Sequence, residues 1–244
     1  MNFSRYLELN KNSLADFHTH TSYCDGGNTA AEMAAAAFAQ GLKVYGFSGH
    51  GYTPYDESYC MLLSDQEAYE AEVRALAAEY AGRMEILCGV EQDCLAGTPT
   101  RDWDYVIGSV HYIDCSPEGG GIVVIDETKE IWQETAEKYF GGDVYAMIER
   151  YYETVSRVVE MTGADIIGHL DLITKYNAGG EGGKQGAHLM IIAGEIENFS
   201  QACFSTGGEG GKGKVNAPSG GAGYGGGGSE SSGGSSGWCF IYTA

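Results

Sequence analysis

Residues 14–20 read LADFHTH, a short β-type run that ends in two histidines. Four similar runs follow along the chain, and amphipathic helical stretches separate them. This alternation is typical of a largely parallel sheet or barrel covered by helices, so we predict one α/β domain. The candidate strands are Leu14–His20, Lys43–His50, Glu85–Asp93, Asp104–Tyr112 and Ala164–Leu172.

Helix boundaries between these strands carry their own signals. Thr29 and Ser64 are each followed three positions later by a glutamate, which is the capping-box spacing at the start of a helix. Glycines stand where three helices are expected to end, because glycine tolerates the left-handed conformation of a helix terminus. These glycines are Gly41, Gly82 and Gly163, and two further predicted helices are Glu127–Phe140 and Asp143–Thr162.

Composition narrows the class of protein. The chain has 244 residues, 43% of them hydrophobic, and a formal net charge of −20. Nucleic acid and anionic membranes are bound through clustered Lys and Arg, so this balance argues against both as partners. No apolar run is long enough to span a bilayer and the start lacks a signal peptide, so we expect a cytoplasmic protein. The seven cysteines show no paired CxxC spacing and are interpreted as reduced thiols.

The character of the sequence changes after about Ala178. The β/α alternation stops, and Gly207–Gly237 is rich in glycine and serine. Such a segment buries too little apolar surface to offset its chain entropy. We therefore divide the chain into a domain at 1–178 and a poorly ordered tail at 179–244, in which His188–Phe199 is predicted to form one short helix.

The positions of the histidines indicate a chemistry. Five of the six lie in or at the carboxyl ends of the candidate strands, and one glutamate has the same placement. In parallel α/β barrels these strand ends form the catalytic face, so the side chains are expected to converge. Imidazole and carboxylate together suit Zn, Mn or Fe, and two or three such ions would share a bridging carboxylate. The residues are His18, His20, His50, His111, His169 and Glu91, with Glu91 as the bridge.

Several neighbouring residues have more than one interpretation. Asp25 is a candidate ligand, but it lies in an ordinary turn sequence, CDGG, and the turn is the simpler reading. Asp171 could bind a metal, hold the second nitrogen of His169, or cap a loop. His188 lies in the aberrant tail and is not expected to be a ligand. Cysteine ligation or nucleophilic attack by Cys24, Cys94 or Cys115 is rejected, because none has a zinc-site spacing.

Five motifs together resemble one known family. They are DFHTHTSYCDG at 16–26, SGH at 48–50, GVEQD at 89–93, GSVHY at 108–112 and GHLDLITKYN at 168–177. Their order and spacing are similar to the histidinol-phosphatase branch of the polymerase and histidinol phosphatase (PHP) superfamily. The resemblance covers about residues 14–178. It implies a distorted, TIM-like seven-stranded (β/α) barrel that hydrolyses L-histidinol phosphate, a small-molecule substrate, in histidine biosynthesis.

The same resemblance implies the roles of the site residues. The expected metal ligands are His18, His20, Asp25, His50, Glu91, His111 and His169, for two or three divalent ions. It identifies no catalytic side chain, because a metal-bound hydroxide is expected to attack phosphorus.

The chain departs from the family at its end. Family members supply two more ligands from a late Asp-x-His segment, whereas this chain has no Asp after Asp171. We therefore expect a barrel that is incomplete at the carboxyl terminus. An inactive or weakly active metal-binding remnant is one alternative function. A PHP phosphoesterase for another small phosphate ester is the other.

Overall fold

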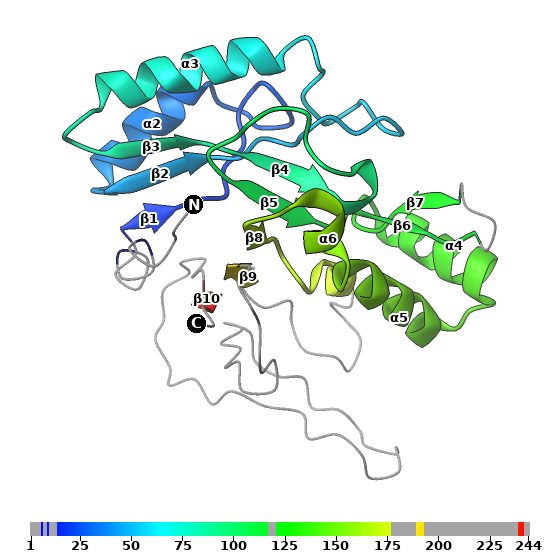
Figure 1. Cartoon of the computed structure of the whole chain (residues 1–244). Helices are drawn as coiled ribbons and strands as arrows, with labels where there is room; N and C mark the ends of the chain where they lie inside the picture. Colours follow the sequence, from blue (N-terminus) through cyan, green and yellow to red (C-terminus); the bar gives the residue numbers. More distant parts are fainter. Residues whose placement is uncertain are drawn as a thin grey trace.

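The computed structural model describes residues 6, 9, 14–116, 121–176, 189–192 and 239–241. Its strands form two main sheets with mostly parallel pairing (Figure 1). The first sheet contains β1 (Ala15–Asp16), β2 (Val44–Phe47) and β3 (Glu85–Cys88), all parallel. The second contains β4 (Val90–Asp93), β5 (Val106–Ser109) and β8 (Ile166–Ile167), also parallel, and then β9 (Leu189–Ile192) and β10 (Cys239–Ile241). The β9 strand runs antiparallel to β8 and parallel to β10.

A single extended segment connects the two sheets. Its first part, β3, pairs with β2 in the first sheet. After Gly89 its second part, β4, pairs with β5 in the second sheet. An isolated bridge between His50 and Glu91 continues the β2 side past the end of that strand. Glu91 therefore lies where the two sheets meet.

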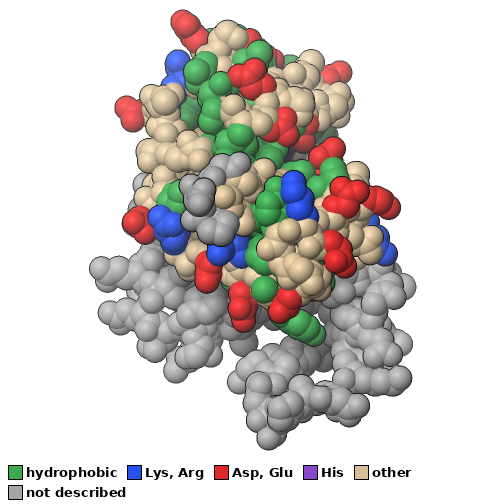
Figure 2. Space-filling view, turned by 90° about the vertical axis from the view of Figure 1, so that its right-hand side faces the viewer, with side chains coloured by type: hydrophobic (Ala, Val, Ile, Leu, Met, Phe, Trp, Pro, Cys, Tyr) green, Lys and Arg blue, Asp and Glu red, His purple; other side chains and the backbone are tan. Residues whose placement is uncertain are grey.

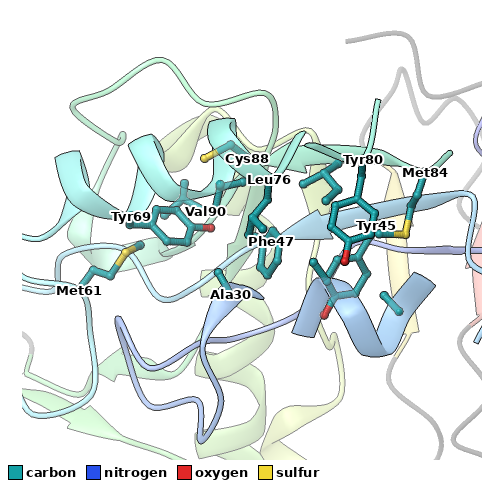
Figure 3. Close-up of a cluster of buried hydrophobic side chains, with 14 residues drawn as sticks. Ala30, Tyr45, Phe47, Met61, Tyr69, Leu76, Tyr80, Met84, Cys88 and Val90 are labelled. Atoms are coloured by element: carbon teal, nitrogen blue, oxygen red, sulfur yellow. The ribbon is translucent and has the colours of Figure 1, made fainter. Parts of the chain in front are cut away.

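Helices α2 (Ala30–Ala39) and α3 (Gln66–Glu79) cover the outer face of the first sheet (Figure 1). Both helices place apolar side chains at helical spacing against the strands. Phe47, Tyr69 and Val90 belong to this buried cluster, and Figure 3 shows how helix and strand side chains interdigitate within it. Burial on this scale stabilises each large side chain by about 1.5–3 kcal/mol.

A second layer packs on the other sheet. It consists of α4 (Lys129–Phe140), α5 (Val144–Val155), α6 (Val158–Thr162) and the antiparallel hairpin of β6 (Tyr112–Asp114) and β7 (Ile122–Val124). Two short 3-10 turns, η1 (Cys94–Ala96) and η2 (Leu172–Thr174), complete it. Ile113, Met147 and Tyr151 are among its fully buried side chains.

Tyr105 forms the centre of a third cluster, which packs on the inner face of the two sheets. Its ring is fully buried, and its hydroxyl donates to the carbonyl oxygens of Phe17 at 2.6 Å and Phe47 at 3.0 Å. A Cβ at Gly46 or Gly89 would collide with this ring, so only glycine fits at both positions. The cluster lies directly beneath the strand ends that carry the histidines.

The five predicted strands all occur, but the paired segments are shorter. The Lys43–His50 prediction becomes Val44–Phe47, and Ala164–Leu172 becomes only Ile166–Ile167. Pairing continues irregularly past both strands: after β2, His50 forms a bridge with Glu91, and after β8 the Gly168 amide donates to the Gly108 carbonyl at 2.9 Å. The β6–β7 hairpin was not predicted.

The predicted helix signals are confirmed with one exception. Thr29 and Glu32 form the reciprocal capping box, and all three predicted glycine terminators have positive φ. The box at Ser64 was wrong, since the cap position is Asp65 and its side chain caps no amide. The predicted Asp143–Thr162 helix is interrupted at Ser156 and Arg157, between α5 and α6.

The carboxyl-terminal predictions are only partly addressed. The short helix predicted at His188–Phe199 was wrong for Leu189–Ile192, which form β9. Gly207–Gly237 lies outside the described residues. The described residues form a mixed α/β fold with two mostly parallel sheets, and the seven-stranded barrel stays a prediction.

None of the described helices is long and apolar enough to cross a membrane. Acidic side chains are scattered over the face in Figure 2, in keeping with the strongly negative net charge.

Candidate metal centre

Glu91 is the centre of the candidate site. Its side chain is only 1% exposed, and β4 holds it at the junction of the two sheets. Imidazole nitrogens approach both carboxylate oxygens. Oε2 lies 3.0 Å from His18 Nε2, 3.2 Å from His20 Nε2 and 3.2 Å from His50 Nδ1. Oε1 lies 3.0 Å from His169 Nε2 and 3.6 Å from His111 Nε2.

His18 and His20 reach the same oxygen because they alternate along an extended segment just after β1. Thr19, between them, points the other way, and its hydroxyl donates to the Gly46 carbonyl at 2.9 Å. The two imidazole rings stack with centroids 5.3 Å apart. The predicted pairing of the two histidines on one face is therefore observed, although the regular strand ends at Asp16.

The other three histidines follow the ends of β2, β5 and β8. His50 and His111 rings lie edge to face at 5.0 Å, and His111 and His169 rings do so at 4.9 Å. Close packing requires glycine beside them: a Cβ at Gly168 would collide with the Ser109 hydroxyl, which itself donates to Glu91 Oε1. All three histidines are buried.

Asp25 stands at the rim of the site. One carboxylate oxygen is 2.9 Å from His20 Nδ1 and the other is 3.7 Å from His50 Nε2, while about half of the side chain (49%) is exposed. Asp25 also belongs to the predicted turn, where the Gly26 and Cys24 amides donate to the Thr21 carbonyl. The turn and the donor role are thus compatible. Cys24 Sγ lies 3.8 Å from His20 Nδ1.

Two buried residues at the site were not predicted. Asp93 accepts hydrogen bonds from the His111 amide and the Tyr55 hydroxyl, and its carboxylate lies 3.4 Å from His111 Nδ1. Ser109 bonds Glu91 as described above. Both lie two positions from a predicted site residue along the same extended segment, so period-two alternation was a signal that could have identified them.

Asp171 and His188 are the two remaining sequence candidates. Asp171 precedes η2, but its side chain does not cap that turn, so the loop-capping interpretation is not supported at η2. It belongs to none of the clustered donor groups among the described residues. His188 lies outside the described residues.

Charge is distributed unevenly over the cluster. Burial raises the pKa of Glu91, but the surrounding histidines lower it more, and the net pKa is well below the usual range. Burial lowers the pKa of His50 to about 3 and that of His169 to about 4. Burial also lowers the pKa of His20 and His111, but their carboxylate partners raise it to about 12 and about 9. The metal-free site therefore holds a carboxylate and a mixture of neutral and charged imidazoles.

The donor atoms fit divalent cations. Among the described residues, three groups have ligand atoms that all lie within 4.8 Å of one another: His18, Glu91 and His169; His20, His50 and Glu91; and His20, Cys24 and Asp25. The last group places Cys24 among the possible donors, whereas cysteine ligation was rejected from the sequence. Glu91 Oε2 is buried and accepts no hydrogen bond from the described part of the chain, although three imidazole nitrogens surround it. A buried carboxylate oxygen in that position is costly unless a cation or proton offsets it. Nitrogen and carboxylate donors together match Zn, Mn or Fe.

Comparison with known proteins gives matches to one family. The PHP domain family model matches residues 16–201. A curated relative from Deinococcus radiodurans, named "Probable histidinol-phosphatase", is 36% identical over 174 residues. The match covers 67% of this chain and 62% of the relative, so the chain spans less than two thirds of the length of that protein.

Solved structures resemble the chain in fold. A Listeria monocytogenes protein assigned as a histidinol phosphatase has a TM-score of 0.56 at 21% identity, with 67% of this chain and 69% of that chain covered. A Lactococcus lactis histidinol phosphate phosphatase, complexed with zinc, L-histidinol and phosphate, has a TM-score of 0.49 at 21% identity. That match covers 66% of this chain and 59% of the other.

Proposed function

The chain belongs to the PHP domain family, and from that premise we propose that it is a metal-dependent phosphomonoesterase that hydrolyses L-histidinol phosphate to L-histidinol and phosphate. One observation carries the proposal: five imidazoles from four strand ends surround the two oxygens of one buried carboxylate, Glu91. The name of the Deinococcus radiodurans relative supports the substrate.

Two or three divalent cations fit this donor set. Glu91 is suited to bridge two of them, because His18, His20 and His50 face Oε2 whereas His111 and His169 face Oε1. The third donor group, His20, Cys24 and Asp25, is suited to a cation at the rim. When bound, such cations would supply positive charge to the phosphate oxygens and make water acidic enough to attack phosphorus.

The residues around the ligands hold them in position. Asp93 keeps the His111 ring oriented through its contact with Nδ1, and it is itself held by Tyr55. Ser109 fixes Glu91 by donating to Oε1. Loss of such a contact to a metal ligand by mutation typically lowers metal affinity or activity by about 10–100-fold.

The larger architecture belongs to the same proposal. We propose that the two sheets, joined through β3 and β4, are parts of a distorted seven-stranded barrel, and that residues 1–178 form the catalytic unit. The parallel pairing of β1, β2 and β3 in one sheet and of β4, β5 and β8 in the other supports this arrangement, as does the cluster around Tyr105.

A second candidate function is metal binding with little turnover. The observation that favours it is the absence of any Asp after Asp171, because the family resemblance implies two further ligands from a late Asp-x-His segment. Both candidates share the same metal centre, and they differ only in the rate of phosphate release.

The deciding experiment uses protein stripped with a chelator and reloaded with Zn²⁺ or Mn²⁺. Phosphate release from L-histidinol phosphate is measured for the wild type, Glu91→Gln, and Glu134→Gln, whose side chain is exposed on α4. Metal-dependent turnover in the wild type and the α4 variant, but not in Glu91→Gln, supports the phosphatase. Stoichiometric metal binding without turnover supports the second candidate. Turnover that needs no metal contradicts both.

A further inference from the structure

A cavity of about 350 Å³ opens beside the metal centre. Asp25, His50 and His111 form the wall that it shares with the centre. The rest of the lining comes from the loop after β2 and from the β6–β7 hairpin, with Tyr59, Tyr112 and Val124. A group bound at the centre through its phosphate would therefore extend its organic part into this cavity.

Two tyrosines give the cavity a flat aromatic wall. The Tyr59 ring packs edge to face on His50 at 4.7 Å, and Tyr112 stacks on Tyr59 at 6.1 Å with planes 26° apart. Their hydroxyls are fixed, Tyr59 by Thr53 at 3.0 Å and Tyr112 by Asp56 at 2.7 Å. Ring faces held in this way suit a flat or cationic ligand group.

The charged side chains that line the cavity are all acidic apart from the two histidines. They are Asp25, Asp56, Asp126 and Glu127. Asp126 is partly offset by Lys175, whose Nζ lies 3.3 Å away. Within the described residues no Lys, Arg or His forms an ion pair with Asp56, and hydrogen bonds from Ser58 and Tyr112 hold its carboxylate in place. These bonds hold the pKa of Asp56 below its usual value, so it is ionised at neutral pH.

We propose that this cavity is the specificity subsite of the enzyme: it receives the organic part of the phosphate ester and selects one that carries a positive charge, with Asp56 facing the cation. The inference rests on the proposed phosphatase function and adds what the site recognises besides phosphate. Cations at the centre attract phosphate whatever it is attached to, so discrimination between esters has to come from the neighbouring walls. Asp56 and Glu127 supply the charge, and Tyr59 and Tyr112 supply the contact surface.

Binding of the organic part alone tests the subsite without any requirement for turnover. Isothermal titration uses the full chain loaded with Zn²⁺ and two probes, L-histidinol, whose amine is protonated, and N-acetyl-L-histidinol, whose amide is neutral. The wild type is expected to bind the cationic probe about tenfold more tightly, the scale of one charge-assisted hydrogen bond. Asp56→Asn is expected to abolish that preference. Asp102→Asn, the same change at an exposed position outside the cavity, is expected to retain it.

Kinetics separate this inference from the proposed function. Asp56→Asn is expected to raise KM for L-histidinol phosphate about tenfold with a much smaller change in kcat, and the control Asp102→Asn is expected to leave both constants and the hydrolysis of β-glycerophosphate unchanged. If no ester releases phosphate, the proposed phosphatase function is wrong. The subsite proposal is then still tested by the preference for the cationic probe in the titration.

Equal binding of the two probes by the wild type, no detectable binding of either, or an unchanged preference in Asp56→Asn would each overturn the subsite. Glu127→Gln serves as a second variant if Asp56→Asn does not fold, because the Glu127 side chain is exposed. It is expected to reduce the preference about threefold, and an unchanged preference in that variant overturns the subsite equally.

Discussion

Substitution of Glu91 by Gln tests the metal centre through stability. Two of the three clustered donor groups contain Glu91, and both of its oxygens face imidazoles. The change keeps the size and shape of the side chain and removes only the charge and one acceptor. It therefore eliminates the shared ligand of both groups and leaves only the group at His20, Cys24 and Asp25.

The expected magnitude follows from linkage. A ligand at one hundred times its dissociation constant stabilises the folded state by about 2.7 kcal/mol. For a chain of this size each kcal/mol moves Tm by about 2–4 °C, so saturating Zn²⁺ is expected to raise the wild-type Tm by about 5–10 °C. In Glu91→Gln we expect less than about a third of that rise, because only the exposed group at the rim remains.

The assay is thermal unfolding followed by circular dichroism, on chelator-stripped protein with and without Zn²⁺. The relevant quantity is the difference between the two Tm values of each variant, so a change in metal-free stability cancels. Glu134→Gln is the matched control and is expected to behave as wild type. An equal Zn²⁺-induced rise in Glu91→Gln and wild type would refute the assignment of Glu91 as the shared ligand.

Three further outcomes are expected. Asp93→Asn should weaken metal affinity about 10–100-fold, since it loosens the orientation of His111, as equilibrium dialysis would measure. Gly89→Ala should lower the free energy of unfolding in urea by about 1–3 kcal/mol, because its Cβ collides with Tyr105. The metal-free Tm should peak near pH 6.5. The pKa of His169 is lowered to about 4 in the folded protein, so the stability linked to this group is lost as pH falls from 6.5 through 4. The pKa of His111 is raised to about 9, so the stability linked to this group is lost as pH rises from 6.5 through 9.

Each of these outcomes has its own control. Asp102→Asn should leave metal affinity unchanged, and a loss equal to that of Asp93→Asn would remove the special role of Asp93. Gly27→Ala should be close to neutral, because nothing lies within 4 Å of the added methyl group. A metal-free Tm that rises steadily from pH 5 to 9 would contradict the opposite shifts of the two histidine pKa values.

The strand positions were predictable because each strand is a short apolar run that ends in a polar, chemically distinctive group. Strand length was not, since the residues that follow β2 and β8 carry site histidines and keep only isolated backbone contacts with the neighbouring strands. The split of Glu85–Asp93 at Gly89 was also not predictable, because it depends on Tyr105 filling the space of the missing side chain. Complementarity between residues so far apart in sequence leaves no local pattern.

The residues of the candidate site were likewise predictable only in part. Histidines at strand ends and one central glutamate were visible as a pattern, and the structure brings them together with Asp25. Their role as ligands stays a prediction. Asp93 and Ser109 were missed because a buried Asp or Ser within an extended segment resembles a strand terminus or a surface position. The acidic and aromatic cavity draws on two loops and a hairpin, and no sequence period links them.

The position of Glu91 also sets an order of events during synthesis of the chain. His18, His20 and His50 leave the ribosome before Glu91, whereas His169 is 78 residues further on and completes the cluster last. The ends of a long loop must meet before that contact forms, and loops of this length close slowly. A nascent chain therefore exposes an incomplete set of donors for most of its synthesis, and the full site can capture cations only after β8 has docked beside β5.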